Sequence, residues 1–418
     1  MTATAKAPAQ RGSARVRILA VVAVAGPGLL AGLSDDDPAG ITTYSVLGAS
    51  FGYQLLWVLL LSTIALIVFH GLGARMGVVT GQGLTGLIRQ RFGVRSGLAA
   101  TALLVVANTG TTCAEFAGVA VGMELFGVSR LVSVPIAATT VSLLVLRGSF
   151  HRVEHVLLVL SSVFIAYVVS GIASKPDWAA AGRGLVVPSS PLTREALVIA
   201  TATIGTTLAP WGLSFIQSYA ADKKLTVNDL KSERIDVVTG AVLTGVIGFF
   251  VVVACAATLH DQGIRVHDAA DAARALEPLA GSLASTLFAV GLVGAALLAA
   301  SILPLSTAYS VSEFVGSESS VDDHYGDARL FYVSFVAIVV AGAAVVLIPG
   351  VPLISLLVAT QVLNAVLLLP LLGFMYIVAG DADLMGEHVS SPRARAGYLV
   401  AIALIALCVG ALLVLTVT

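Results

Sequence analysis

Eleven stretches of about 20 mostly apolar residues follow one another along this 418-residue chain, and they constrain its fold more than any other feature. The expected spans cover residues 17–50, 53–73, 97–124, 130–147, 153–173, 192–221, 236–259, 283–313, 328–348, 352–379 and 396–417. Only 11% of the residues are charged, which is too few to cover the surface of a soluble protein of this size. We therefore predict an all-α integral membrane protein with 11 transmembrane helices.

Charge and cysteine content exclude several classes of function. The net charge of −1 argues against a partner made of nucleic acid, whose binding proteins carry a basic excess. The three cysteines lie far apart inside apolar runs, which predicts neither a disulfide framework nor a cysteine metal site. We expect no cofactor, no enzymatic activity, and a monomer surrounded by the lipid bilayer.

Basic residues in the loops predict the orientation of the chain. If the N-terminus is cytoplasmic, 17 of the 23 Lys and Arg residues fall on the inner side and 6 on the outer side. Residues 1–16 then form a cytoplasmic tail, the first span is not cleaved, and the C-terminus is extracytoplasmic. The expected location is the cytoplasmic membrane, which the chain crosses many times.

Two spans are interrupted by a proline followed two residues later by glycine. The first reads Asp37-Pro38-Ala39-Gly40 and the sixth reads Ala209-Pro210-Trp211-Gly212. Each interrupted span is the first of a group of five spans. Two such groups are typical of an inverted repeat, whose broken helices line a substrate site near the bilayer midplane. We predict a first five-helix unit over 17–173, an extracellular loop over 174–191, a second unit over 192–379, and a loop with the eleventh helix over 380–418.

A few polar residues inside spans are candidates for the site, because a charge at a helix centre is unfavourable in lipid. Asp37, next to the proline, is the first choice for an ion ligand. Asp35 and Asp36 point in other directions on a helix, so they either meet water in a vestibule or stay protonated. Glu115 carries a proton or binds a neighbouring helix, and Gln361 is either a ligand or an interhelical hydrogen-bonding group.

Two other motifs lack the context that their chemistry needs. Gly81-Gln82-Gly83-Leu84-Thr85-Gly86 matches a dinucleotide-binding pattern, but no strand is expected before it. We interpret it as a cytoplasmic loop that leads into a short amphipathic helix over residues 87–92. His151-Arg152-Val153-Glu154-His155 matches a zinc-protease pattern without an evident third ligand. It is the best support for an alternative reading as a membrane enzyme or receptor.

Around these breaks the chain resembles the NRAMP family of divalent-metal transporters. Four segments are similar, in order, to the family patterns GPG, DPGN, FGYxLLW and RLGxxTG: residues 26–30, 37–40, 51–57 and 75–81. The resemblance covers nearly the whole chain and implies a fold of leucine-transporter type, with broken helices 1 and 6.

The resemblance also implies which residues hold the ion. The family uses the Asp and Asn of DPGN, together with a backbone carbonyl and a Met sulfur of A-x-x-M-P-H in the sixth span. Here the aspartate is Asp37 and the Asn position is Gly40. Thr206 and Ala209 stand at the Ala and Met positions, and Gln361 matches a tenth-span glutamine that can approach the ion.

Two further departures concern residues that could carry protons. The family His of the sixth span is Trp211, and the third-span pattern T-D-x-x-E keeps Glu115 but has Thr112 in place of Asp.

The replacement of Asn and Met by Gly40 and Ala209 changes the metal preference that the resemblance implies. Loss of the Met thioether removes a preference for softer transition metals, and the smaller side chains enlarge the pocket. The pattern is similar to that of the NRAMP-related magnesium transporters.

These observations predict a secondary transporter of hydrated Mg²⁺, and also of Mn²⁺, that works by alternating access with weak or no proton coupling. Asp37, Gly40, Thr206, Ala209 and Gln361 would form the ion site, with Glu115, Asp36 and Asp35 as proton or vestibule residues. Two alternatives stay open. One is a proton-coupled Mn²⁺ or Fe²⁺ transporter of the ordinary family type, and the other is a symporter of an organic solute with Na⁺ on the same fold.

Overall fold

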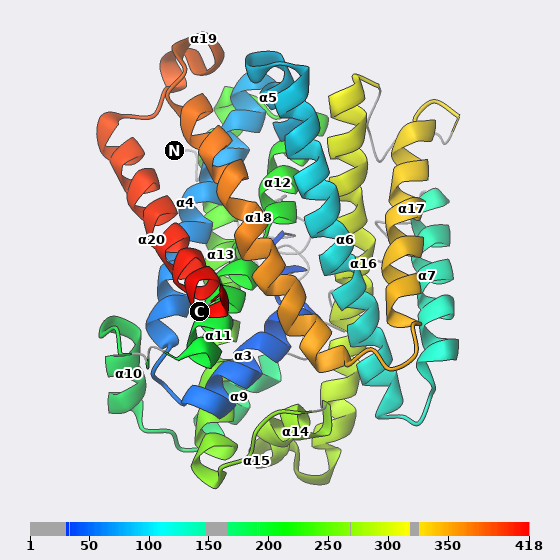
Figure 1. Ribbon diagram of the computed structural model, residues 1–418, viewed down its shortest axis with the longest axis vertical. Helices are drawn as coiled ribbons and strands as arrows, with labels where there is room; N and C mark the ends of the chain where they lie inside the picture. Colours follow the sequence, from blue (N-terminus) through cyan, green and yellow to red (C-terminus); the bar gives the residue numbers. More distant parts are fainter. Residues whose placement is uncertain are drawn as a thin grey trace, which may run out of the picture.

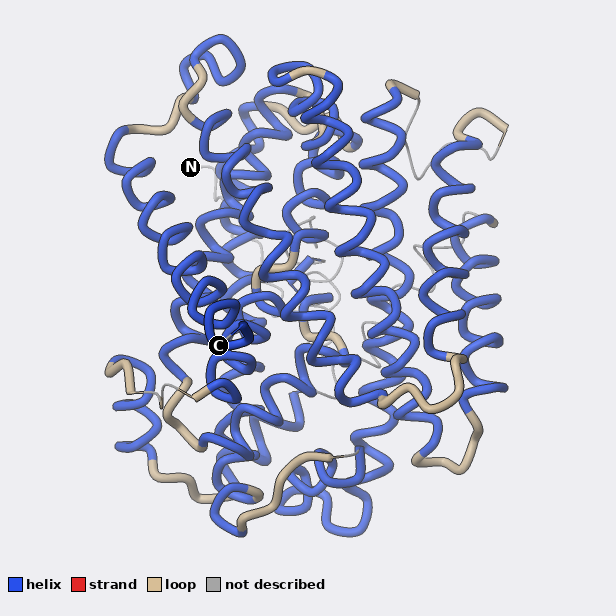
Figure 2. Tube along the Cα trace, in the orientation of Figure 1, coloured by secondary structure: helices blue, strands red, loops and turns tan. Residues whose placement is uncertain are grey.

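The computed structural model describes residues 31–32, 34–147, 165–189, 191, 193–267, 269–317 and 326–417. Within these ranges the regular structure is entirely helical (Figures 1 and 2), as predicted. The longer helices run between the two ends of the molecule in the view of Figure 1. The α-helices are α3 (Pro38–Phe51), α4 (Leu56–Thr80), α5 (Leu84–Phe92), α6 (Val94–Glu124), α7 (Arg130–Leu146), α9 (Ile165–Ala173), α10 (Trp178–Val186), α11 (Arg194–Thr207), α12 (Pro210–Asp222), α13 (Leu230–Thr258), α14 (Ala269–Ala273), α15 (Glu277–Ala280), α16 (Ala284–Val315), α17 (Arg329–Val346), α18 (Leu353–Ala379), α19 (Ala382–Met385) and α20 (Pro392–Val417).

The described ranges contain 8 helical stretches that are long and apolar enough to cross a membrane. Each overlaps a predicted span, although the stretches that begin at Val227 and Ala270 start well before the predicted residues 236 and 283. The sixth predicted span comprises α11 and α12 together. The shorter apolar helix α7 coincides with the fourth predicted span. The first and fifth predicted spans lie partly outside the described residues, so the total of 11 stays a prediction.

Glycines allow the helices to approach closely, as expected for contacts between helices in lipid. A Cβ atom at Gly48 of α3 would overlap the carbonyl oxygen of Val252 in α13. A Cβ at Gly77 of α4 would likewise overlap the carbonyl oxygen of Gln217 in α12. The backbones of these pairs therefore touch directly, and larger side chains would separate the helices.

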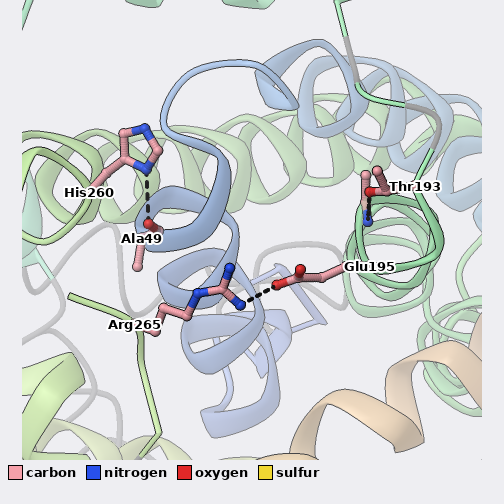
Figure 3. Close-up of polar contacts among 6 residues, drawn as sticks. Ala49, Thr193, Glu195, His260 and Arg265 are labelled. Carbon is pink, nitrogen blue, oxygen red and sulfur yellow. Dashed lines mark hydrogen bonds and ion pairs between the residues drawn. The ribbon is translucent and has the colours of Figure 1, made fainter. Parts of the chain in front are cut away.

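Polar contacts stabilise the ends of the molecule. At the end with α5 and α19, Arg91 pairs with Asp381 and holds the pKa of that carboxyl below its usual range. At the opposite end, His260 Nδ1 lies 3.0 Å from the carbonyl oxygen of Ala49, and Arg265 Nη1 lies 3.2 Å from Glu195 Oε1 (Figure 3). Thr193 caps α11 nearby, where its hydroxyl accepts a hydrogen bond from a backbone amide (Figure 3).

Candidate functional site

The first break lies at Asp36 and Asp37, where the helical residues 34–35 end and α3 begins at Pro38. Pro38 favours this start because its missing N–H would have no partner in the first turn of a helix. Asp37 is the N-cap in an extended conformation, and its Oδ1 accepts a hydrogen bond of 2.6 Å from the amide of Gly40. The helix N-terminus therefore fixes the position of one Asp37 oxygen.

The second break separates α11, which ends at Thr207, from α12, which begins at Pro210. Ala209 is the buried, extended N-cap of α12 and offers no side-chain cap. The last carbonyls of α11 lack partners within that helix. In Figure 1, α11 occupies the lower half of the molecule and α12 the upper half, so this break lies between the two ends. Buried backbone without regular hydrogen bonds at this depth is typical of a transporter binding site.

The two breaks meet at Gly40. A Cβ atom placed there would lie 2.9 Å from the carbonyl oxygen of Asp35, 3.2 Å from Asp37 Oδ1 and 3.3 Å from Thr206 Oγ1. Three oxygens from both broken helices therefore surround one point that has no side chain. Tyr44 of α3 strengthens this junction, because its hydroxyl lies 2.8 Å from Thr207 Oγ1 of α11.

Glu115 of α6 is fully buried and faces the same junction. A Cβ atom at Gly118, one turn further along α6, would overlap the ring of Pro38, so this face of α6 lies against the start of α3. The carboxyl groups of Asp37 and Glu115 are close enough to interact, although neither Glu115 oxygen has a hydrogen bond of regular geometry. A cation or a shared proton between them would relieve the repulsion of two buried carboxylates.

Gln361 of α18 approaches the site through its backbone. A Cβ atom at Gly205, next to Thr206, would overlap the Gln361 carbonyl oxygen. The Gln361 side-chain oxygen instead accepts a hydrogen bond of 2.9 Å from Asn364 Nδ2, which also reaches Thr111 of α6 at 2.9 Å. The side chain thus takes part in interhelical hydrogen bonding, which is one of the two roles that the sequence allows. Its Nε2 has no hydrogen-bond partner among the described residues.

Asp35 and Asp36 are also buried, and none of their carboxylate oxygens has a hydrogen-bond partner among the described residues. Buried charges without partners are strongly unfavourable unless a proton, water or an ion compensates them. Asp35 Oδ1 lies 4.0 Å from the position of a Cβ on Gly212.

His70 of α4 is a residue that the sequence did not single out. Its imidazole is 2% exposed, and its Nε2 has no hydrogen-bond partner among the described residues. This nitrogen lies 3.0 Å from the position of a Cβ on Gly212. The imidazole and the Asp35 carboxylate therefore share the space beside Gly212, the residue after Trp211. An ionisable residue inside the predicted span 53–73 is the sequence signal that could have pointed to His70.

The arrangement is open rather than a compact cage. Among the described residues, no three His, Cys, Asp or Glu side chains converge as they would around a fully coordinated metal ion. A cation at Gly40 would instead meet one certain carboxylate, a hydroxyl and backbone carbonyls. Such a set of oxygens suits a hard cation that keeps part of its water shell.

The structure describes one of the two motifs that match patterns of other kinds of site. The segment Gly81 to Gly86 follows helix α4, not a strand, and enters α5, which begins at Leu84. This is the loop and short helix that the sequence predicts. A dinucleotide-binding fingerprint needs a strand before its glycines, and here a helix precedes them. His151 to His155 lie outside the described residues.

Comparison with known proteins gives a consistent result. The family described as natural resistance-associated macrophage protein-like matches residues 28–415. A divalent metal cation transporter MntH from Yersinia enterocolitica is 29% identical over 379 residues, which cover 88% of both chains. The MntH transporter of Aeromonas hydrophila is 29% identical over 385 residues, which cover 89% of this chain and 90% of that one.

Solved structures show the same fold. The manganese transporter of Eremococcus coleocola has a TM-score of 0.74 at 20% identity, over 96% of this chain and 87% of that one. The nucleobase-cation-symport-1 transporter Mhp1 has a TM-score of 0.58 at 14% identity, over 93% of this chain and 90% of that one. The helical fold of this chain is therefore similar to that of transporters of known structure.

Proposed function

Since this chain belongs to the natural resistance-associated macrophage protein-like family, we propose that it moves divalent metal cations across a membrane. The relatives that are 29% identical over 88% of the chain are divalent metal cation transporters, which supports this cargo. The strongest structural support is the meeting of Asp37 Oδ1, Thr206 Oγ1 and the Asp35 carbonyl at Gly40. Alternating access would expose this point to each side of the membrane in turn.

The cation would be held mainly by charge. Asp37 is the electrostatic anchor, and the carbonyls near Thr206 and Ala209 supply neutral oxygens from the second break. Gln361 would close the site from α18. Because Gly40 and Ala209 offer no amide or thioether side chain, the ion would retain several waters.

These ligands favour Mg²⁺ and allow Mn²⁺. Mg²⁺ is usually bound through one or two carboxylates with several waters kept, and Mn²⁺ also accepts carboxylate, carbonyl and water ligands. A thioether that would favour softer metals is missing at Ala209. We propose Mg²⁺ as the main cargo, Mn²⁺ as a second one, and weak or no proton coupling, with Glu115 as the group that could still carry a proton.

The proposed topology follows the sequence. It has 11 spans, in which residues 17–173 and 192–379 form two inverted five-helix units joined by an extracytoplasmic loop. The N-terminus would be cytoplasmic, the C-terminus extracytoplasmic, and the working unit a monomer in the cytoplasmic membrane.

Uptake by proteoliposomes tests the role of Asp37. Asp37→Ala removes both the charge and the helix cap, whereas Asp37→Asn removes the charge and keeps a good capping residue. We expect both variants to lose uptake of Mg²⁺ and Mn²⁺. Only Asp37→Ala should also lower the stability, by about 1 kcal/mol.

Three uptake measurements distinguish the proposed function from its alternatives. Full uptake by Asp37→Asn would contradict the electrostatic anchor. Mg²⁺ uptake that is unaffected by excess Na⁺ and organic amine would dismiss the symporter alternative. Lumen acidification that accompanies metal entry would contradict uncoupled transport.

A further inference from the structure

A second acidic cavity lies far from the breaks, at the end of the molecule that carries α5. It has a volume of about 320 Å³, and the residues that line it include Gln82, Gly83, Ser218, Asp222 and Glu313. Asp222 is the last residue of α12, which begins at the second break. Because α12 has 13 residues, the cavity lies about 20 Å along this helix from the central site.

Glu313 explains the glycines of the segment Gly81 to Gly86. A Cβ atom at Gly83 would overlap the Glu313 carboxylate, and one at Gly86 would lie 3.6 Å from Glu313 Cβ. The carboxylate faces the N-terminus of α5, where the Thr85 hydroxyl lies 3.1 Å from Oε2 and the Thr85 amide is also close. The glycine-rich loop therefore surrounds a carboxylate of the same chain at the N-terminus of α5.

The cavity keeps unused oxygens. Asp222 Oδ2 accepts a hydrogen bond of 2.7 Å from the Tyr309 hydroxyl, which leaves Asp222 Oδ1 available. The Ser218 hydroxyl is 2% exposed and lies beside Glu313, without a hydrogen bond of regular geometry to any described residue. This hydroxyl can therefore donate either to the Glu313 carboxylate or to a group bound in the cavity.

The described residues that line this cavity include no Lys or Arg. Two basic residues nearby have other contacts. Arg89 donates to the carbonyl of Phe314 and Lys223 lies 5.3 Å from the centre of the Tyr219 ring. Among the described residues, the side chains that line the cavity are thus acidic or neutral.

We propose that this cavity is a second, transient site for a hydrated divalent cation, a proposal that rests on the proposed transport of such ions. Two carboxylates, a hydroxyl and backbone carbonyls are the oxygen ligands that Mg²⁺ and Mn²⁺ accept. Six water molecules occupy about 180 Å³ at their volume in the liquid, so a hexahydrated ion fits the cavity. In the proposed orientation this end faces the cytoplasm, and the site would receive ions that leave the central break along α12.

The number of Mn²⁺ ions bound per chain tests the proposal. The full chain in lipid nanodiscs is titrated with Mn²⁺, and free Mn²⁺ is measured by electron paramagnetic resonance. We expect two ions for the unchanged chain, one for Asp37→Asn, and none when Asp37→Asn is combined with Asp222→Asn. Asp222→Asn keeps an acceptor for Tyr309, so the fold should persist, as thermal unfolding would show.

Two further variants sharpen the result. In the Asp37→Asn background, Ser218→Ala should raise the Kd of the remaining ion by about threefold to tenfold, as loss of one hydrogen bond predicts. Glu387→Gln removes an exposed carboxylate outside the cavity and should leave both ions bound. Retention of one ion by the Asp37→Asn, Asp222→Asn double variant would overturn the proposal, as would an Asp37→Asn variant that binds none.

The outcome is separable from that of the proposed function. One ion bound by the unchanged chain and none by Asp37→Asn would remove the second site and leave the central one. Two bound ions together with full uptake by Asp37→Asn would keep the second site and contradict the proposed function.

Discussion

At the scale of single residues, Gly40 lies where the two breaks meet. A side chain at this position would lie 2.9 Å from the backbone oxygen of Asp35, which cannot move without a shift of the break itself. In the proposed site, the cation would share this space with the oxygens of Asp35, Asp37 and Thr206.

Gly40→Ala should reduce uptake of Mg²⁺ and Mn²⁺ by about tenfold or more. Overpacking of a tight position costs about 1–3 kcal/mol, and here the added methyl also occupies the ion position. Gly71→Ala on α4 is the matched control, because a Cβ there meets nothing within 4 Å. Equal initial uptake rates in proteoliposomes for Gly40→Ala and Gly71→Ala would show that Gly40 is not at the ion site.

At the scale of helices, the contact of α11 with α18 carries the second break. Gly205 of α11 lies against the backbone of Gln361. A Cβ atom built at Gly205 would also lie 2.7 Å from the amide nitrogen of Ala365. Both neighbours are backbone atoms inside a helix, so neither can rotate away. The packing of these two helices thus determines where Thr206 lies.

Gly205→Ala should destabilise the folded protein by about 1–3 kcal/mol and lower the melting temperature in detergent. Gly373→Ala in α18 is its control, because a Cβ there has nothing within 4 Å. In a helix interior alanine is about 1 kcal/mol more favourable than glycine, so this control should melt at the same or a higher temperature. The prediction fails if the two variants melt alike.

At the scale of the whole molecule, the sequence predicted the fold better than the site. Apolar length and the prolines at residues 38 and 210 predicted the long helices and both breaks, because each depends on local chemistry. The junction at Gly40 joins residues far apart in the sequence, and only the resemblance pointed to Thr206 as the partner of Asp37. His70 is an ionisable residue inside a span and so could have been a candidate, but its proximity to Asp35 depends on how α4 packs beside Gly212. The role of Gly83 likewise depends on Glu313, far along the chain.

The orientation of the whole molecule is the last prediction. The inner side should carry the α5 end, where Glu387 is exposed, and the outer side should carry Gln262, which is exposed at the opposite end. In a background with Cys408→Ser, a membrane-impermeant maleimide added to intact cells should label Gln262→Cys and spare Glu387→Cys. Cys113 and Cys255 are buried and should not react. After the membrane is permeabilised both introduced thiols should be labelled, which controls for their reactivity. Labelling of Glu387→Cys alone in intact cells would contradict the predicted orientation. The side with 17 of the 23 basic residues would then face outwards, against the tendency of Lys and Arg to lie in cytoplasmic loops.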